Sequence, residues 1–396
     1  MTHVEARPLP AGASLLHIGL PKTGTTAVQA SASRLRAELL AQGVCYPGAA
    51  LNHGRASNAL MGRSTAVFEA GDLSRWKRIA RERWRHPEAI GWLSYEQIVQ
   101  AETDVARRFL EELGPELHVA ITVRAYVPMF ASAWQQWVKD AGDVDFGAWL
   151  AAVTAVRTGR ASADGPEWAE AFWRRHDLAA IAARWAALVG PERVHVVVLD
   201  KARPALLFDA FEGLLGLTPG TLASVPRDPL LDNRSLSRAE AELVQEVNRR
   251  ALGAPTLDRA LYYRVMRNGA VATMLRHRKP SADEGTMAVP RAAAEVIAAE
   301  GAAAARRLAD LGVDVLGDAA MLADAPASPP ATVPSPHTAV DPDLAAHAVV
   351  GAISSALGAG VSFAGGRPGI DSPHVPPSRR AVVAELRRRA LPGGAR

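Results

Sequence analysis

SLLHIGLPKTGTT, residues 14–26, is the stretch from which the fold of this chain can be predicted. Its first six residues are a short apolar run that stops at Gly19, which is typical of a buried strand. A helical pattern follows from about Thr25 to Gln42. A turn between a strand and a helix brings free backbone N–H groups and the positive helix end to one point. The stretch therefore predicts an anion site best suited to phosphate.

Further apolar segments alternate with helical patterns along the chain. We expect strands at IGWLS (90–94), LHVAITV (117–123) and VHVVVLD (194–200), and helices at about 73–86, 103–113, 130–140, 145–156 and 166–189. This alternation favours a parallel sheet covered on both faces, which is a three-layer α/β/α fold. After Asp200 the pattern is mostly helical, through 204–216, 236–251 and 290–311, with one more short segment at 313–318.

Composition narrows the class of protein. The chain has 396 residues, of which 48% are hydrophobic and 22% charged, so wholesale disorder, coiled coil and collagen are excluded. The single cysteine, Cys45, excludes an intramolecular disulfide and a cysteine-based zinc site. The first residues do not read as a secretory signal, so we expect a cytoplasmic protein. The arginines are scattered without interleaved aromatic residues, so no nucleic-acid partner is expected.

Lysine is rare in this chain. Five of the 45 basic residues are lysine, and these are Lys22, Lys77, Lys139, Lys201 and Lys279. The other forty basic residues are arginine. Each lysine is therefore a candidate for a role that a guanidinium cannot fill.

The spacing of Gly19 and Gly24 matches the nucleotide-binding pattern GxxxxGK[ST], but the lysine does not. The position after Gly24 is Thr25, and the lysine stands at position 22, on the loop itself. We find no strand ending in an aspartate suited to magnesium apart from Asp200. A magnesium triphosphate is therefore disfavoured, and a phosphotransferase that uses ATP and magnesium remains the alternative.

The strand–PKTGTT–helix unit resembles the 5′-phosphosulfate-binding loop of the sulfotransferases. That family takes a sulfuryl group from 3′-phosphoadenosine-5′-phosphosulfate (PAPS). The resemblance implies a P-loop-like sulfotransferase fold with a helical C-terminal part, PAPS as the donor and no metal. It implies that Lys22 stabilises the leaving phosphate. It also implies that the loop binds the donor through Lys22, Thr23, Gly24, Thr25 and Thr26.

A second motif lies in ITVRAYVPMFASAWQQ, residues 121–136. Arg124 ends the expected strand, and Ser132 is expected in the first turn of the next helix. An arginine clamp and a helix-start serine suit a phosphate, and the carboxyl edge of a parallel sheet is where ligands bind. The spacing of eight resembles the 3′-phosphate-binding motif of the sulfotransferases. The segment 233–248 also resembles that family, which makes Arg234 a further donor-binding candidate.

The acceptor hydroxyl, or amine, needs a general base. Sulfotransferases use His or Glu, often in the loop after the first helix or at the end of the second strand. Those places hold His53 and Glu96, and the near-neutral pKa of an ordinary histidine favours His53. The acceptor is an unidentified small molecule, saccharide or lipid. A non-catalytic member of the fold that only binds a phosphorylated nucleotide is the third hypothesis.

The chain divides into three parts by composition. We expect an N-terminal extension at 1–13, a sulfotransferase α/β domain at 14–323, and a linker and tail rich in Pro, Ala and Gly at 324–396. Residues 344–366 carry no charged side chain but are only weakly hydrophobic, so they predict a loose tail rather than a membrane span. Residues 378–391 predict a short basic helix.

Overall fold

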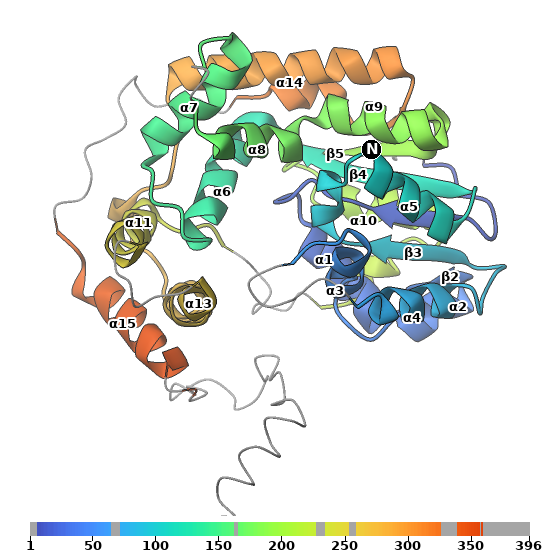
Figure 1. The fold of residues 1–396 in the computed structure, drawn as a ribbon, viewed down its shortest axis with the longest axis horizontal. Coiled ribbons are helices and arrows are strands. Elements are labelled where there is room, and N and C mark those ends of the chain that lie inside the picture. The colour runs from blue at the N-terminus through green and yellow to red at the C-terminus, as the bar shows by residue number, and fades with distance from the viewer. Residues whose placement is uncertain are drawn as a thin grey trace, which may run out of the picture.

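Six parallel strands form the centre of the protein, seen here in a computed structural model, and their order is β2-β3-β1-β4-β5-β6. The structure describes residues 6–64, 72–161, 165–226, 234–252, 259–325, 339–356 and 358. Figure 1 shows the sheet on one side of the molecule and a helical part on the other. The predicted basic helix at 378–391 lies outside the described residues.

The predicted fold class, an α/β fold with a central parallel sheet, is confirmed. The strands that apolar runs predicted are β1 (Ser14–His17), β3 (Ile90–Ser94), β4 (Leu117–Arg124) and β5 (Val194–Leu199). The short segment expected at 313–318 contains a further strand, β6 (Asp314–Leu316). The two-residue strand β2 (Val44–Cys45) was not predicted, because a run that short carries no periodicity. In register, Leu15 of β1 stands between Trp92 and His118.

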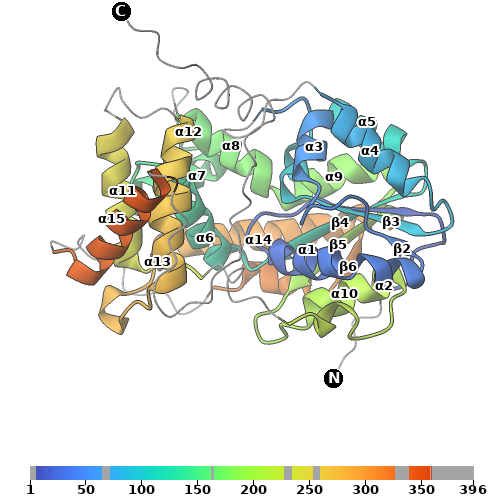
Figure 2. The ribbon, with the colours of Figure 1, turned by 90° about the horizontal axis from the view of Figure 1, so that it is seen from below.

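Helices cover both faces of the sheet, as Figure 2 shows. One face carries α1 (Thr25–Arg34), α2 (Arg36–Ala41) and α10 (Leu206–Leu215). The other carries α3 (Gly54–Leu60), α4 (Ser74–Arg83), α5 (Thr103–Leu113) and α9 (Leu178–Val189). Successive strand residues alternate between the two cores, since Leu15 packs with the α10 side and Leu16 with the α9 side. Strands β1 to β5 are thus buried on both faces, whereas the edge strand β6 is only partly buried.

Most of the helical part lies beyond the carboxyl ends of the strands, and its longest helix runs back beside α9 (Figure 1). Its helices are α6 (Tyr126–Lys139), α7 (Phe146–Thr158), α8 (Glu167–His176), α11 (Arg238–Leu252), α12 (Arg259–Tyr262), α13 (Ala272–His277), α14 (Arg291–Leu311) and α15 (Pro342–Ala356). A π-helix, η4 (Tyr263–Val271), joins α12 to α13. Short 3₁₀ helices are η1 (Glu96–Gln100), η2 (Pro191–Arg193), η3 (Leu222–Ser224), η5 (Ala282–Glu284) and η6 (Ala319–Ala323).

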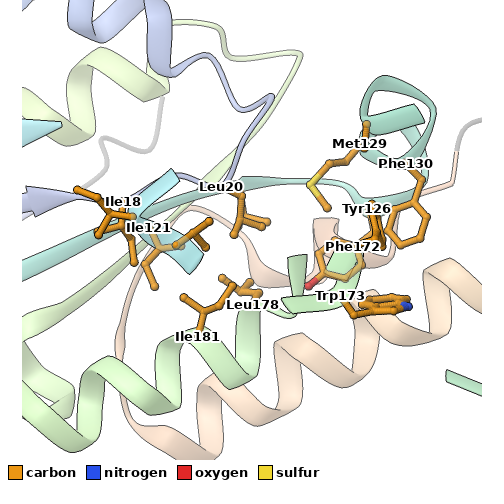
Figure 3. Packing of buried hydrophobic residues seen from close by; sticks show 14 of the residues in the cluster. Ile18, Leu20, Ile121, Tyr126, Met129, Phe130, Phe172, Trp173, Leu178 and Ile181 are labelled. Atoms are coloured by element: carbon orange, nitrogen blue, oxygen red, sulfur yellow. The ribbon is translucent and has the colours of Figure 1, made fainter. Parts of the chain in front are cut away.

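One apolar core connects the loop after β1 to the helical part. Figure 3 shows Ile18 and Leu20 of that loop beside Ile121 of β4. The same core continues into a cluster of rings on α6 and α8, in which Phe130 and Phe172 have centroids 4.8 Å apart. Strand, loop and α6 are therefore fixed relative to one another by packing.

Three predicted helix boundaries were wrong. The helix expected at 25–42 breaks at Leu35, and the one expected at 166–189 breaks at Asp177, whose side chain caps α9. Helix α6 begins at Tyr126 rather than at 130, because Pro128 lies in its first turn, where a missing N–H costs nothing. Ser132 therefore lies in the second turn and not the first.

Part of the expected loose tail is a helix. Leu344 of α15 is buried, and α15 packs against η4 and α13. Glycines allow the close approach, since a Cβ on Gly351 would lie 2.6 Å from the carbonyl oxygen of Gly269. The domain boundary at 323 stays a prediction. In the described part of the chain, no helix is long and apolar enough to cross a membrane.

Candidate anion-binding site

The loop after β1 is held against β4 and turns sharply into α1. Its backbone exchanges hydrogen bonds with Thr122, which donates to Gly19 and accepts from Leu20, both at 2.6 Å. Gly19 has a φ of 108°, and a Cβ there would lie 2.8 Å from the carbonyl oxygen of Glu96, so only glycine fits. Gly24, with a φ of 76°, is the N-cap of α1 and offers no side chain to cap it. The first amides of α1 are thus uncapped.

A buried hydrogen-bond network supports the loop after β1 on the side that faces the sheet. His17 Nδ1 lies 2.9 Å from Ser94 Oγ, and its Nε2 lies 3.2 Å from Thr122 Oγ1. Thr23 Oγ1 lies 2.6 Å from Thr122 Oγ1 and also donates to the Leu20 carbonyl at 2.6 Å. Burial lowers the pKa of His17 to about 3, so the ring is neutral at physiological pH. The Thr23 hydroxyl therefore holds the loop in shape.

The same network reaches Glu96, the first residue of η1. Gln29 of α1 donates to Ser94 Oγ at 3.1 Å and to Glu96 Oε2 at 3.4 Å. Asn52 donates to Gln29 Oε1 at 3.3 Å, which fixes the orientation of the amide. Glu96 is half-buried and close enough to Lys22 that its charge raises the lysine's pKa. The structure thus brings a carboxylate to the loop after β1.

Lys22 and Arg124, from the two predicted motifs, come together. Lys22 Nζ donates to Gln136 Oε1 of α6 at 3.4 Å. Burial lowers the pKa of Lys22, and the charges of Arg124 and Arg267 lower it further, whereas Asp140 and Glu96 raise it. A cation cluster therefore stands at the carboxyl edge of the sheet, between β1, β4 and α6.

Arg124 has unused hydrogen-bonding capacity. Its Nη2 reaches the Pro128 carbonyl only at 3.4 Å, and its buried Nε has no hydrogen-bond partner among the described residues. Burial lowers its pKa, although a guanidinium stays charged at neutral pH. Ser132 lies one turn after Pro128, and its half-buried hydroxyl makes no hydrogen bond within the described ranges. Both side chains can therefore accept an anionic ligand.

Asp140, directly after α6, ties the π-helix to this cluster. Its carboxylate accepts hydrogen bonds from Arg267 Nη1, from Tyr263 OH at 3.2 Å and from Gln136 Nε2 at 3.1 Å. Gln136 stands four residues after Ser132 on α6, so helical spacing could have identified it. Nothing in the sequence of 263–271 identified Arg267, which reaches the site from a distant element.

His53 lies near the loop but offers no free nitrogen. Its Nδ1 accepts from the Ser94 backbone N–H at 2.9 Å, and its Nε2 donates to the Pro47 carbonyl at 2.9 Å. The ring is buried, and burial lowers its pKa to about 4. In this arrangement neither ring nitrogen is available to take a proton from an acceptor.

Arg234 is engaged in a buried ion pair. Its two Nη atoms meet the carboxylate oxygens of Glu240 at 2.7 Å each, and Nη2 also donates to the Met274 carbonyl at 2.8 Å. Glu240 is fully buried. The arginine joins α11 to α13, and both of its Nη atoms are used by protein groups.

The remaining predicted residues keep the expected positions at the start of α1. Thr25 is buried and Thr26 half-buried, and both belong to the first turn. Asp200, the carboxylate considered for magnesium, accepts from the Ala202 N–H at 2.7 Å and from Arg203 Nε at 3.0 Å. Both Asp200 oxygens are thus used in hydrogen bonds within the turn that follows β5, which does not favour the ATP hypothesis.

Comparisons with known proteins find a distant structural likeness but no family. No protein family and no curated protein matches the sequence. The chain is similar to the crystal structure of a sulfotransferase from Alicyclobacillus acidocaldarius, with 19% sequence identity and a TM-score of 0.38. The alignment covers 70% of this chain and 98% of that chain. A likeness at this level does not carry a function from one chain to the other.

Proposed function

We propose that this protein is a sulfotransferase that uses PAPS as the donor and a hydroxyl or amine as the acceptor. The observation that supports it is the meeting of Lys22 and Arg124 at the carboxyl edge of adjacent parallel strands. After β1 the chain forms β2 and β3 on one side of β1, and it then forms β4 on the other side. Ligands of open parallel sheets bind at such a point, where the direction of strand addition reverses. Two separate cations beside uncapped helix amides suit a ligand with two phosphates.

Each group has a defined task in the proposed complex. The α1 amides with Thr25 and Thr26 hold the 5′-phosphate, and Arg124 with Ser132 holds the 3′-phosphate. Sulfuryl transfer breaks the bond between sulfur and the bridging oxygen and forms a bond from sulfur to the acceptor oxygen. Negative charge grows on the departing phosphate, and the ammonium of Lys22 stabilises it there. Adenosine 3′,5′-bisphosphate leaves.

Glu96 is the better candidate for the general base. The acceptor hydroxyl loses its proton as the new bond forms, and the base must have a free lone pair. Glu96 is held by Gln29 on one oxygen and lies near Lys22, whereas both nitrogens of His53 are occupied. We therefore assign the proton to the Glu96 carboxylate and give His53 a supporting role.

Calorimetric titration with adenosine 3′,5′-bisphosphate, compared with ATP–Mg²⁺, tests the proposal. We expect the bisphosphate to bind and ATP–Mg²⁺ not to bind. Lys22→Ala and Arg124→Ala should each weaken binding by about 1.5–3 kcal/mol, the worth of a charged hydrogen bond. The exposed Lys77 and Arg107 provide matched controls, because Lys77→Ala and Arg107→Ala remove the same charges away from the site. Binding of ATP–Mg²⁺ alone would establish the phosphotransferase instead.

A further inference from the structure

Lys139, the last residue of α6, has a buried side chain whose amine has no partner among the described residues. Its exposed fraction is 6%. Within the described ranges its Nζ makes no hydrogen bond and no ion pair, although Asp140 is the next residue. A buried ammonium without a counter-ion is costly, so such a group either loses its proton or meets an anion.

The position of Lys139 on α6 directs it to the anion site. Ser132, Gln136 and Lys139 follow one another at spacings of four and three, so they form one stripe along the helix. Gln136 in the middle of the stripe accepts the hydrogen bond from Lys22. The stripe therefore faces the loop after β1, and Lys139 stands at its far end.

The charges around Lys139 are mostly positive. Burial lowers its pKa most, to about 7, and Lys22 of the loop, Arg267 of η4 and Arg234 before α11 lower it as well. Asp140 raises it, but that carboxylate is shared among Arg267, Tyr263 and Gln136. Near neutral pH the free protein is therefore divided between the ammonium and the amine.

We propose that Lys139 is a ligand of the donor's phosphates and that it takes up a proton when the donor binds. The Nζ lone pair of the neutral amine receives a proton from solvent, and the resulting ammonium pairs with a phosphate oxygen. The anion supplies a counter-ion that pairs with the Lys139 ammonium directly, which no described residue does, so binding and protonation favour each other. This inference rests on the proposed function, which provides the anionic ligand.

Carbon-13 NMR of lysine-labelled protein tests the proton directly. The chain has five lysines, so five Cε signals are expected, and Lys139→Met identifies the one from Lys139. In the free protein this signal should titrate at about pH 7, well below the usual range of a lysine. Adding adenosine 3′,5′-bisphosphate at pH 8 should move it to the position of the protonated form, while the Lys77 signal stays in place.

Calorimetry in buffers of different ionisation enthalpy counts the same proton. At pH 8 the phosphates are already ionised, since their second pKa is about 6. We expect an uptake of about one proton per bisphosphate bound. Lys139→Met should abolish the uptake and weaken binding about tenfold or more. Lys139→Arg should bind with little loss and without proton uptake, and Lys77→Met should behave as the unchanged protein.

The outcomes separate this inference from the proposed function. If the bisphosphate binds but the Lys139 signal does not move, the role of Lys139 is overturned and the sulfotransferase proposal stands. If the bisphosphate does not bind, the proposed function falls, and inorganic pyrophosphate becomes the probe. If pyrophosphate then moves the Lys139 signal, Lys139 is still an anion ligand. If it does not, the role of Lys139 is overturned together with the proposed function.

Discussion

His53 uses both ring nitrogens in hydrogen bonds to the backbone, one to the N–H of Ser94 and one to the carbonyl of Pro47. These bonds connect the loop before α3 to the end of β3, next to Glu96. A histidine bound in this way fixes the backbone from which Glu96 projects. A carboxylate held on one oxygen, by comparison, keeps lone pairs for a ligand.

Replacing His53 should therefore affect stability more than it affects ligand binding. His53→Ala leaves two buried backbone groups unpaired and should lower the free energy of unfolding by about 2–4 kcal/mol. Glu96→Gln is the matched comparison. It preserves the shape of the side chain and should leave both unfolding and bisphosphate affinity almost unchanged, while sulfuryl transfer is lost. Urea denaturation measures the first effect, and a His53→Ala protein of unchanged stability would contradict the supporting role.

At the scale of elements, the loop after β1 depends on the absence of a side chain at Gly19. Gly43 has a comparable φ of 80°, but no atom lies within 4 Å of a Cβ placed there. Gly43→Ala should thus cost only the backbone strain, about 1–2 kcal/mol. Gly19→Ala adds a contact with the Glu96 carbonyl and should displace the loop.

We expect Gly19→Ala to weaken bisphosphate binding about tenfold or more, because both the loop amides and Lys22 move. Gly43→Ala should bind the bisphosphate as the unchanged protein does. Titration calorimetry compares the two affinities, with circular dichroism confirming that both variants are folded. Equal affinities for the two variants would show that the close packing of the loop on Glu96 does not matter for binding.

The elements that the sequence predicted well are those with strong local patterns. Helix α5 begins and ends where its amphipathic pattern does, and β4 follows its run of β-branched residues. Lys22 and Arg124 could be predicted to lie close because each follows a strand whose neighbour is parallel to it. Lys139 and Arg267 could not be placed in the site, because their meeting depends on how η4 packs against α6, and no local pattern encodes that.

At the scale of the whole molecule, α15 supports the site from outside. It packs on η4, which carries Arg267 to Asp140. Buried Arg278, just after α13, binds Glu284 of η5 and, at 3.0 Å, Asp343 of α15. Helix α15 is thus fastened to the π-helix by packing and to the end of α13 by charge.

Gly351→Val should therefore disturb the site at a distance. Its side chain would meet the Thr273 hydroxyl at 2.5 Å and the Gly269 carbonyl at 2.6 Å, so α15 must move away, at a cost of about 1–3 kcal/mol. Hydrogen exchange in 263–271 should become faster, and bisphosphate affinity should fall. Ala356→Val, at an exposed position of the same helix, is the control. Unchanged exchange in Gly351→Val would show that α15 does not support η4.

Stability of the whole protein should depend steeply on pH, because buried neutral histidines are spread through it. Burial lowers the pKa of His17 and His176 to about 3, and that of His53 and His118 to about 4. An unfolded chain binds these protons near pH 6.5, whereas the folded protein does not. The stability that these neutral histidines contribute is therefore complete above pH 6.5 and is lost as the pH falls toward 4.

Near pH 5.5 unfolding should take up three to four protons, so the free energy of unfolding should fall by about 4–5 kcal/mol per pH unit. Urea denaturation between pH 7.5 and 5 measures this slope. His176→Phe removes one of these protons together with the hydrogen bond of 2.8 Å between His176 Nδ1 and the Phe172 carbonyl. The His176 ring stacks on Phe172, and its buried Nε2 has no hydrogen-bond partner among the described residues. The hydrogen bond is lost at both pH values, so the change with pH reports the proton: relative to the parent, this variant should gain about 1 kcal/mol of stability between pH 7.5 and 5.5. A slope that corresponds to the uptake of less than one proton on unfolding would mean that these rings are already protonated in the folded protein.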